Sequence, residues 1–179
     1  ALGRRLLLRI DGVGSFLLVR GDRIGIGRAG PDATADIPLI SDLSERAAEI
    51  IRAGEDYFVM ASGGVELAGR PVEYALLQDG DRVRVGRRVK LDFRRPSSKS
   101  TSAVLDFGEG VRMASDCRRV ILWDGPVVMG AGKECHIRLP AGSSSVVLIE
   151  RGGRMFVKPA ASASQIVPLP LGMSVELGE

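Results

Sequence analysis

The chain has 179 residues, which suits one ordinary domain or two small ones. Hydrophobic residues make up 45% and charged residues 26%, which excludes a disordered chain, and no apolar run approaches the length of a membrane span. The formal charge of +3 permits an anionic partner but lacks the dense basic clusters of a nucleic-acid binder. We expect a soluble, cytoplasmic protein that binds neither nucleic acid nor membrane.

Short apolar runs separated by turn signals follow one another along the chain. Residues 82–85 alternate strictly between arginine and valine, as a half-buried strand does, and Asp79-Gly80-Asp81 before them is a turn signal. The only helix-like pattern covers residues 42–50, where Ser44 could cap a turn, although residues 49–52 also fit a strand. The chain is therefore predicted to be all-β, a sandwich with hairpin connections.

The two halves of the chain share an internal repeat. The frame Leu-x-x-Gly-x-x-Val-x-Val-Gly at residues 77–86 returns at 169–178 with leucine in place of the second valine. The segment 24–27 matches 127–130 in the same way. The distance in sequence between matched residues is 103 for the segment 24–27 (130 − 27) and only 92 for the frame at 77–86 (178 − 86). Loops tolerate deletion while registered strands do not, so this predicts a duplicated domain with shorter loops in its second copy.

A polar stretch separates the two copies. Residues 94–102 contain five serines or threonines and no apolar periodicity, as in a linker. The predicted organisation is a first sandwich at 1–94, a Ser-rich linker at 95–101 and a second, more divergent sandwich at 102–179 that lacks its last strand. Without that strand, Val175 and Leu177 should form an exposed edge that invites pairing with another chain.

The first copy resembles the forkhead-associated (FHA) domain over about residues 4 to 94. The resemblance is carried by Gly27-Arg28, Asp36-Ile37-x-Leu39, Ser44-x-x-Ala47-Ala48-x-Ile50, Gly69 and the frame at 77–86. It implies a β-sandwich whose loops at one end bind phosphothreonine peptides. The family's motif there reads Gly-Arg, then Ser-x-x-His, then Asn-Gly.

Two residues of that motif are present as phosphate donors, Arg28 and Ser44. Ala47 stands where the family has histidine, and Gly63 stands where it has the asparagine that holds the ligand backbone. Glu45 adds a carboxylate that would repel a phosphate. The alternative is that Arg28 and Ser44 are a turn arginine and a capping serine, retained for structure.

The second copy resembles the same family more weakly. Ala131 falls where the first copy has Arg28, so no phosphate-binding arginine is expected there. The loop at 142–145 has hydroxyls but is most simply a polar surface loop.

Other motifs do not indicate an enzyme. The fingerprint Gly25-x-Gly27-x-x-Gly30 lacks the following helix that dinucleotide binding needs. His136, the only histidine, is predicted to be a solvated residue at a strand end, and Cys117 and Cys135 fit no metal spacing and are predicted to be small buried hydrophobes. We therefore expect no catalytic residue, metal or cofactor.

Two functions remain open. The first is a non-catalytic protein-interaction module in signalling or regulation, which binds a phosphothreonine-containing peptide through Arg28 and Ser44. The second is a phosphate-independent scaffold in which both copies have lost phosphopeptide recognition and bind a protein through other surfaces.

Overall fold

The computed structural model describes residues 2–113, 115–161 and 165–176. Nineteen strands and no helix occur in these ranges, so the predicted all-β class is confirmed. It follows that no helix in the described residues could cross a membrane.

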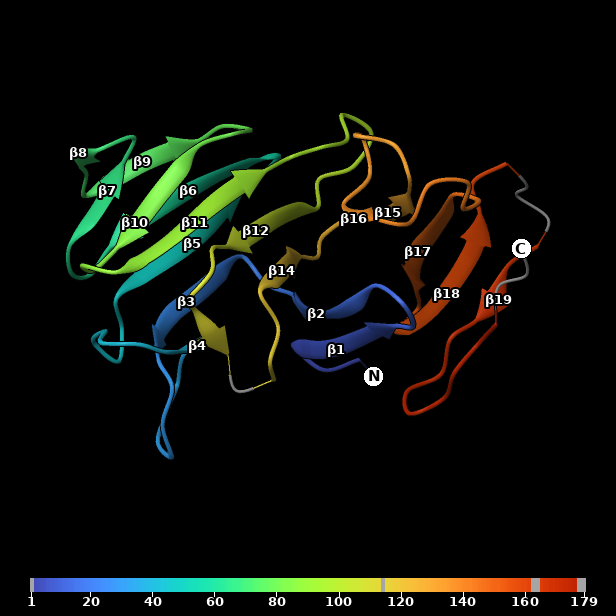
Figure 1. The fold of residues 1–179 in the computed structure, drawn as a ribbon, viewed down its shortest axis with the longest axis horizontal. Helices are drawn as coiled ribbons and strands as arrows, with labels where there is room; N and C mark the ends of the chain where they lie inside the picture. Colours follow the sequence, from blue (N-terminus) through green and yellow to red (C-terminus); the bar gives the residue numbers. More distant parts are fainter. Residues whose placement is uncertain (1, 114, 162–164, 177–179) are drawn as a thin grey trace.

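The strands form three sheets, which we call the central, first outer and second outer sheets (Figure 1). In spatial order, the central sheet consists of β1 (Arg5–Ile10), β2 (Gly14–Val19), β14 (Arg119–Leu122), β12 (Ala103–Phe107), β11 (Val89–Arg94), β10 (Arg82–Val85), β7 (Val65–Leu67) and β8 (Arg70–Pro71). The first outer sheet consists of β13 (Arg112–Met113), β4 (Ile37–Ile40), β3 (Arg23–Arg28), β5 (Ala48–Ala53), β6 (Asp56–Ala61) and β9 (Tyr74–Leu77). The second outer sheet consists of β16 (Ile137–Arg138), β15 (Val127–Gly130), β17 (Val146–Arg151), β18 (Arg154–Pro159) and β19 (Val167–Pro168).

The central sheet contributes to two hydrophobic cores because successive side chains of a strand point to opposite faces. On β2, Leu17 and Val19 pack in the core shared with the first outer sheet, whereas Phe16 and Leu18 pack in the core shared with the second. Neighbouring residues of β12 and β14 divide in the same way. Apolar runs without alternation, such as Phe-Leu-Leu-Val in β2, are what a strand covered on both faces requires.

The second outer sheet repeats the strand order of the first. In the first, β4, β3, β5, β6 and β9 are neighbours, and in the second β16, β15, β17, β18 and β19 follow the same order. The first pair of each series is parallel and the others are antiparallel. The internal repeat of the sequence therefore has a counterpart in topology.

The N-terminal hairpins of the two halves lie side by side. The hairpin β1–β2 pairs in parallel with β14, whereas β12, the start of the second half, pairs with β11 of the first half. In Figure 1 the blue hairpin accordingly lies beside β14 and away from β10 and β11. Strands β2 and β14 run in the same direction, and their antiparallel partners β1 and β12 lie on opposite sides of the pair. An approximate two-fold axis therefore lies between β2 and β14 and runs parallel to them. Each core thus receives strands from both halves of the sequence.

The expected linker is a packed segment. Ser97 and Ser100 are buried, and the Tyr57 hydroxyl donates a hydrogen bond to the Thr101 carbonyl at 2.6 Å. Ser102 is also buried, and its hydroxyl bridges the turn at 124–125. The hydroxyl groups of such a segment can be solvated or can form hydrogen bonds with the backbone of a neighbouring turn, and the sequence alone did not distinguish these two cases. The division into domains at 95–101 stays a prediction, and the central sheet continues across it.

The expected frame at the end of each half is only partly described. The turn after β9 and the turn after β19 match, since Asp81 N–H donates to the Gln78 carbonyl and Met173 N–H to the Pro170 carbonyl. Val175 lies outside any strand, and residues 177–178 are outside the described ranges. The helix-like segment at 42–50 is a loop followed by the start of β5.

Candidate functional site

Gly27 allows the loop between β4 and β5 to cross the end of β3. A Cβ atom at this position would lie 1.8 Å from the Glu45 carbonyl oxygen, so no other residue fits without moving the backbone. The crossing is fixed by two hydrogen bonds: Arg28 N–H donates to the Ser44 carbonyl at 3.0 Å, and Ala47 N–H to the Ile26 carbonyl at 2.9 Å. The Gly-Arg dipeptide therefore holds Arg28 against the loop that carries Ser44.

Gly63 reaches the same end of the first core from the loop after β6. Its N–H donates to the Ala47 carbonyl at 3.1 Å, and a Cβ atom there would lie 3.8 Å from the Ser44 hydroxyl oxygen. A larger side chain at position 63 would therefore extend beside Ser44. The structure brings the three motif positions, Arg28, Ser44 and Gly63, together at one end of the sandwich.

Glu45 pairs with Arg28. The distance from Arg28 Nη2 to Glu45 Oε1 is 3.6 Å, and the two side chains are 53% and 71% exposed. An ion pair so exposed and longer than a hydrogen bond contributes little to stability. Glu45 nevertheless compensates the charge of Arg28, in addition to the repulsion of a phosphate expected from the sequence.

Additional cations lie at this end of the molecule and were not assigned to the site from the sequence. Gly86 N–H donates to the Gly64 carbonyl at 2.8 Å, which brings the turn between β10 and β11 to the site. Arg87 and Arg88 in this turn are exposed, and Arg46 is exposed in the Ser44 loop. The sequence signal that could have located the pair 87–88 is its place in a turn directly after the frame at 77–86.

The corresponding end of the second half has no arginine at this position. A Cβ atom at Gly130 would lie 2.6 Å from the Ser145 hydroxyl oxygen, so a hydroxyl-bearing loop again crosses the end of a strand, here β15. The next residue is Ala131, which offers no donor to a phosphate.

His136 is buried, with 2% of its surface exposed, and the prediction of a solvated strand end was wrong. Its Nδ1 accepts a hydrogen bond from Val128 N–H at 3.0 Å, and Nε2 lies 3.0 Å from the Ser102 carbonyl oxygen. Nε2 therefore carries the proton in this arrangement. Burial lowers the pKa of His136, which favours the neutral ring. The sequence did not predict this burial because it depends on β12, whose first residues cover this strand end.

Asp36 occupies the same place in the first half. Its Oδ2 accepts a hydrogen bond from Gly25 N–H at 2.9 Å, as His136 does from Val128. Burial alone would raise the pKa of Asp36, but the Arg4 guanidinium, 2.6 Å away, and the Gly25 N–H hold the pKa below its usual value. Asp36 and His136 thus accept hydrogen bonds from equivalent backbone N–H groups in the two halves, and their role is structural.

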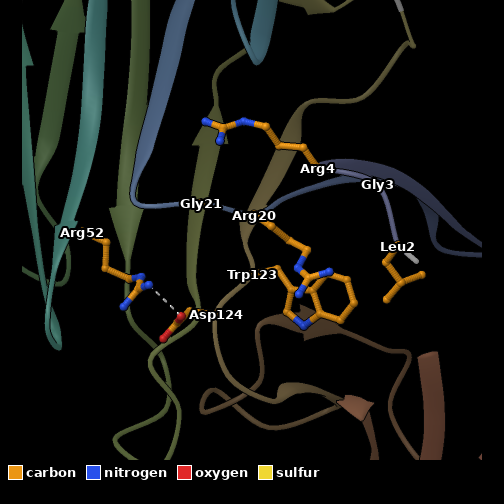
Figure 2. Close-up of a pocket in the computed structure, with 8 residues that line it drawn as sticks. All are labelled: Leu2, Gly3, Arg4, Arg20, Gly21, Arg52, Trp123 and Asp124. Carbon is orange, nitrogen blue, oxygen red and sulfur yellow. Dashed lines mark ion pairs between the residues drawn. The ribbon is translucent and has the colours of Figure 1, made fainter. Parts of the chain in front are cut away.

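A separate open pocket of about 460 Å³ lies where the two halves meet (Figure 2). The arginines of this pocket contact other residues of the chain: Arg52 pairs with Asp124 at 3.0 Å, and Arg20 lies over the Trp123 ring at 5.3 Å. Arg4 donates to Asp36 outside the pocket. These contacts connect the residue after β2, strand β5 and the two residues after β14, so the pocket lies where the two halves contact each other.

In the part of the chain that the structure describes, no three His, Cys, Asp or Glu side chains gather as a metal site would require. Cys117 and Cys135 are buried, as predicted.

The comparisons with known proteins return FHA domains. No family model and no curated protein matches the chain. Among solved structures, a domain from a structural and functional analysis of phosphothreonine-dependent FHA domain interactions is 32% identical, with 45% of this chain and 84% of that domain covered and a TM-score of 0.33. The Rv0020c FHA structure is 31% identical, with 48% and 88% covered and a TM-score of 0.32. The FHA-2 domain of the Mycobacterium tuberculosis ABC transporter Rv1747 is 23% identical, with 62% and 94% covered and a TM-score of 0.38.

The chain is therefore similar to FHA domains, the family that the motifs of its first half resemble. None of these three matches spans the whole chain, and the tandem arrangement of two FHA-like units stays a prediction.

Proposed function

We propose that this chain is a non-catalytic protein-interaction module that binds a phosphothreonine-containing segment at the end of its first core. The observation that carries the proposal is the convergence of Arg28, Ser44 and Gly63, which the close packing of Gly27 under the Ser44 loop enforces. A guanidinium and a hydroxyl, both exposed, can donate to a phosphate dianion. A cytoplasmic location and a signalling or regulatory role are part of the same proposal.

Binding should be weak. Gly63 has no side chain to hold the ligand backbone, and Glu45 competes for Arg28 at 3.6 Å. Each missing or opposed polar contact costs on the order of 1–3 kcal/mol. The cations at 46, 87 and 88 raise the local positive potential and partly offset this loss.

Calorimetry with a degenerate phosphothreonine peptide library and its unphosphorylated form tests the proposal. The phosphorylated peptides should bind more tightly, and Arg28→Ala should abolish the difference. Arg70→Ala removes the same charge from the exposed strand β8 and serves as the matched control. Equal affinity for both forms, unchanged in Arg28→Ala, would contradict the proposal.

The charge of Glu45 gives a second test. Glu45→Arg should strengthen phosphate-dependent binding, because it removes a competing carboxylate and adds a cation beside Arg28. Glu45→Gln should give a smaller gain in the same titration. An unchanged or reduced affinity in both variants would show that the phosphate is not bound beside Arg28.

A phosphate-independent scaffold is the second candidate. The Arg28–Glu45 pair favours it, since the pair gives Arg28 a partner within the chain. In this alternative, a partner binds with the same affinity whether or not it is phosphorylated, and Arg28→Ala changes neither affinity.

A further inference from the structure

Strand β1 is a free edge of the central sheet. It pairs only with β2, and the Arg20 N–H donates to the Arg4 carbonyl at 2.9 Å at the end of that ladder. Hydrogen-bonded and non-hydrogen-bonded pairs alternate in an antiparallel ladder. The backbone groups of Arg5, Leu7 and Arg9 therefore point away from β2. Among the described residues, no strand pairs with them.

In the other half of the chain, the position that corresponds to this free edge is occupied by strand β11. Across the approximate two-fold axis, β1 corresponds to β12, since each is the hairpin partner of β2 or β14. The Gly108 N–H donates to the Lys90 carbonyl, so by the same alternation the backbone groups of Val104 and Asp106 face β11. The central sheet thus continues beyond β12 through β11 but ends at β1.

The side chains that β1 directs into the second core are incompletely covered. Leu6, Leu8 and Ile10 pack against this core but are only half-buried. Their counterparts on β12, which β11 covers, are nearly inaccessible: Leu105 is 0% and Phe107 is 2% exposed. A strand added beside β1 would remove this apolar surface from water.

The outward face of β1 carries Arg5, Leu7 and Arg9. Leu7 is 52% exposed, and neither arginine takes part in an ion pair with a described residue. If two copies paired antiparallel about Leu7, Arg5 of one copy would lie opposite Arg9 of the other, and directly opposed like charges are destabilising. The edge therefore disfavours a second copy and favours a strand with carboxylates on this face.

We propose that β1 is a docking site for an extended segment of another protein, which adds antiparallel to β1 as a ninth strand of the central sheet. Its inward side chains are apolar and complete the second core beside Leu6, Leu8 and Ile10. Its outward side chains are acidic opposite Arg5 and Arg9. Backbone hydrogen bonds supply affinity in such strand addition, and the alternation of side chains supplies specificity.

A fluorescein-labelled peptide containing Val, Glu, Val, Thr, Val and Glu in that order is the probe, with fluorescence anisotropy as the readout. A peptide of the same composition in the order Val, Val, Glu, Glu, Val and Thr is the control, because without alternation it directs a carboxylate into the core in either register. We expect the first peptide to bind at least tenfold more tightly. Equal binding of both, or no binding of either, overturns the proposal.

Two variants locate the binding. Leu7→Pro removes an N–H that points away from β2 and leaves the β1–β2 ladder intact, so it should block docking with little change in melting temperature. Replacing Arg5 and Arg9 by glutamate should weaken binding at least tenfold and restore it for a peptide with lysine in place of glutamate. This charge-reversal arm decides the matter if Leu7→Pro fails to fold. Binding unaffected by the charge reversal overturns the proposal.

Two further readouts separate this surface from other possibilities. Arg28→Ala should leave binding of the valine–glutamate peptide unchanged, which keeps the test independent of the phosphothreonine site. The protein should elute as a monomer. A dimer that the charge reversal strengthens or Leu7→Pro dissolves would show that β1 pairs with a second copy, and would overturn the assignment of a separate partner.

Discussion

At the scale of single residues, the candidate site depends on a glycine rather than on the groups that would touch a ligand. Gly27 lies under the Glu45 carbonyl, and the adjacent Arg28 N–H binds the Ser44 carbonyl. The positions of both proposed phosphate donors therefore follow from one close backbone contact. At Gly130 the close neighbour of a Cβ atom would be the Ser145 side chain instead of backbone, and the donor arginine is absent there.

Gly27→Ala should therefore destabilise the protein, because its Cβ atom would meet backbone that cannot move away without disturbing β3. We expect a loss of about 1–3 kcal/mol or more in the free energy of unfolding, measured by urea denaturation. Gly30→Ala is the matched control, since a Cβ atom there has open space. Equal stability of the two variants would contradict the packing described for Gly27.

His136 predicts the pH dependence of stability near neutrality. Burial lowers its pKa in the folded state, so the unfolded chain takes up a proton first as the pH falls. The stabilisation is complete above the unfolded pKa of about 6.5 and is lost as the pH decreases below it, by at most about 1.4 kcal/mol per pH unit.

Thermal melts between pH 7.5 and 5.5 check this prediction. His136 is the only histidine, so His136→Gln should remove most of the pH dependence in this range. The contribution of Asp36, whose pKa is lowered, disappears only at more acidic pH. A melting temperature that rises on acidification would show that His136 is charged in the folded state.

At the scale of elements, the central strands couple the two cores. Ile121 on β14 lies in the second core and Leu105 on β12 lies in the first, and both are completely buried. Truncation of a buried leucine or isoleucine to alanine costs about 2–5 kcal/mol.

Ile121→Ala and Leu105→Ala should each lower the stability of the whole protein by about this amount. Denaturation followed by Trp123 fluorescence and by circular dichroism should give coincident curves in both variants. Two separated transitions, with each variant shifting only one, would show that the cores unfold independently.

Sequence patterns were sufficient for the all-β class and for many of the turns, because alternation and glycine turns are local properties, whereas only the turn of the repeated frame is matched in both halves. They also identified Arg28, Ser44 and Glu45 as neighbours through the motif. The pairing of β12 with β11 and of β14 with β2 was not predictable, since a hairpin can complete either half with the same apolar pattern. The burial of His136 and of the serines near residue 100 follows from that pairing and was missed with it.

At the scale of the whole molecule, the expected boundary at 95–101 separates segments that share both cores. The first core includes Leu105 and Leu122 from the second half, and the second core includes Phe16 and Leu18 from the first. Cutting the chain there would expose apolar surface in both fragments.

Fragments 1–101 and 102–179 should therefore be poorly folded alone and should recover the native spectrum when they are mixed. Two-dimensional NMR spectra of each fragment and of the mixture are the appropriate measurement. Two separate fragments with well-dispersed spectra that do not change on mixing would instead support independent domains.

The proposed function is tested most directly by an NMR titration of the intact chain with the tightest phosphothreonine peptide from the library. We predict phosphate-dependent shifts of the backbone signals of Arg28, Ser44 to Ala47 and Ser62 to Gly64, with β1 and the second outer sheet unaffected. The unphosphorylated peptide should leave these signals unchanged. Identical shifts with both peptides, or phosphate-dependent shifts located away from Arg28 and Ser44, would contradict the account.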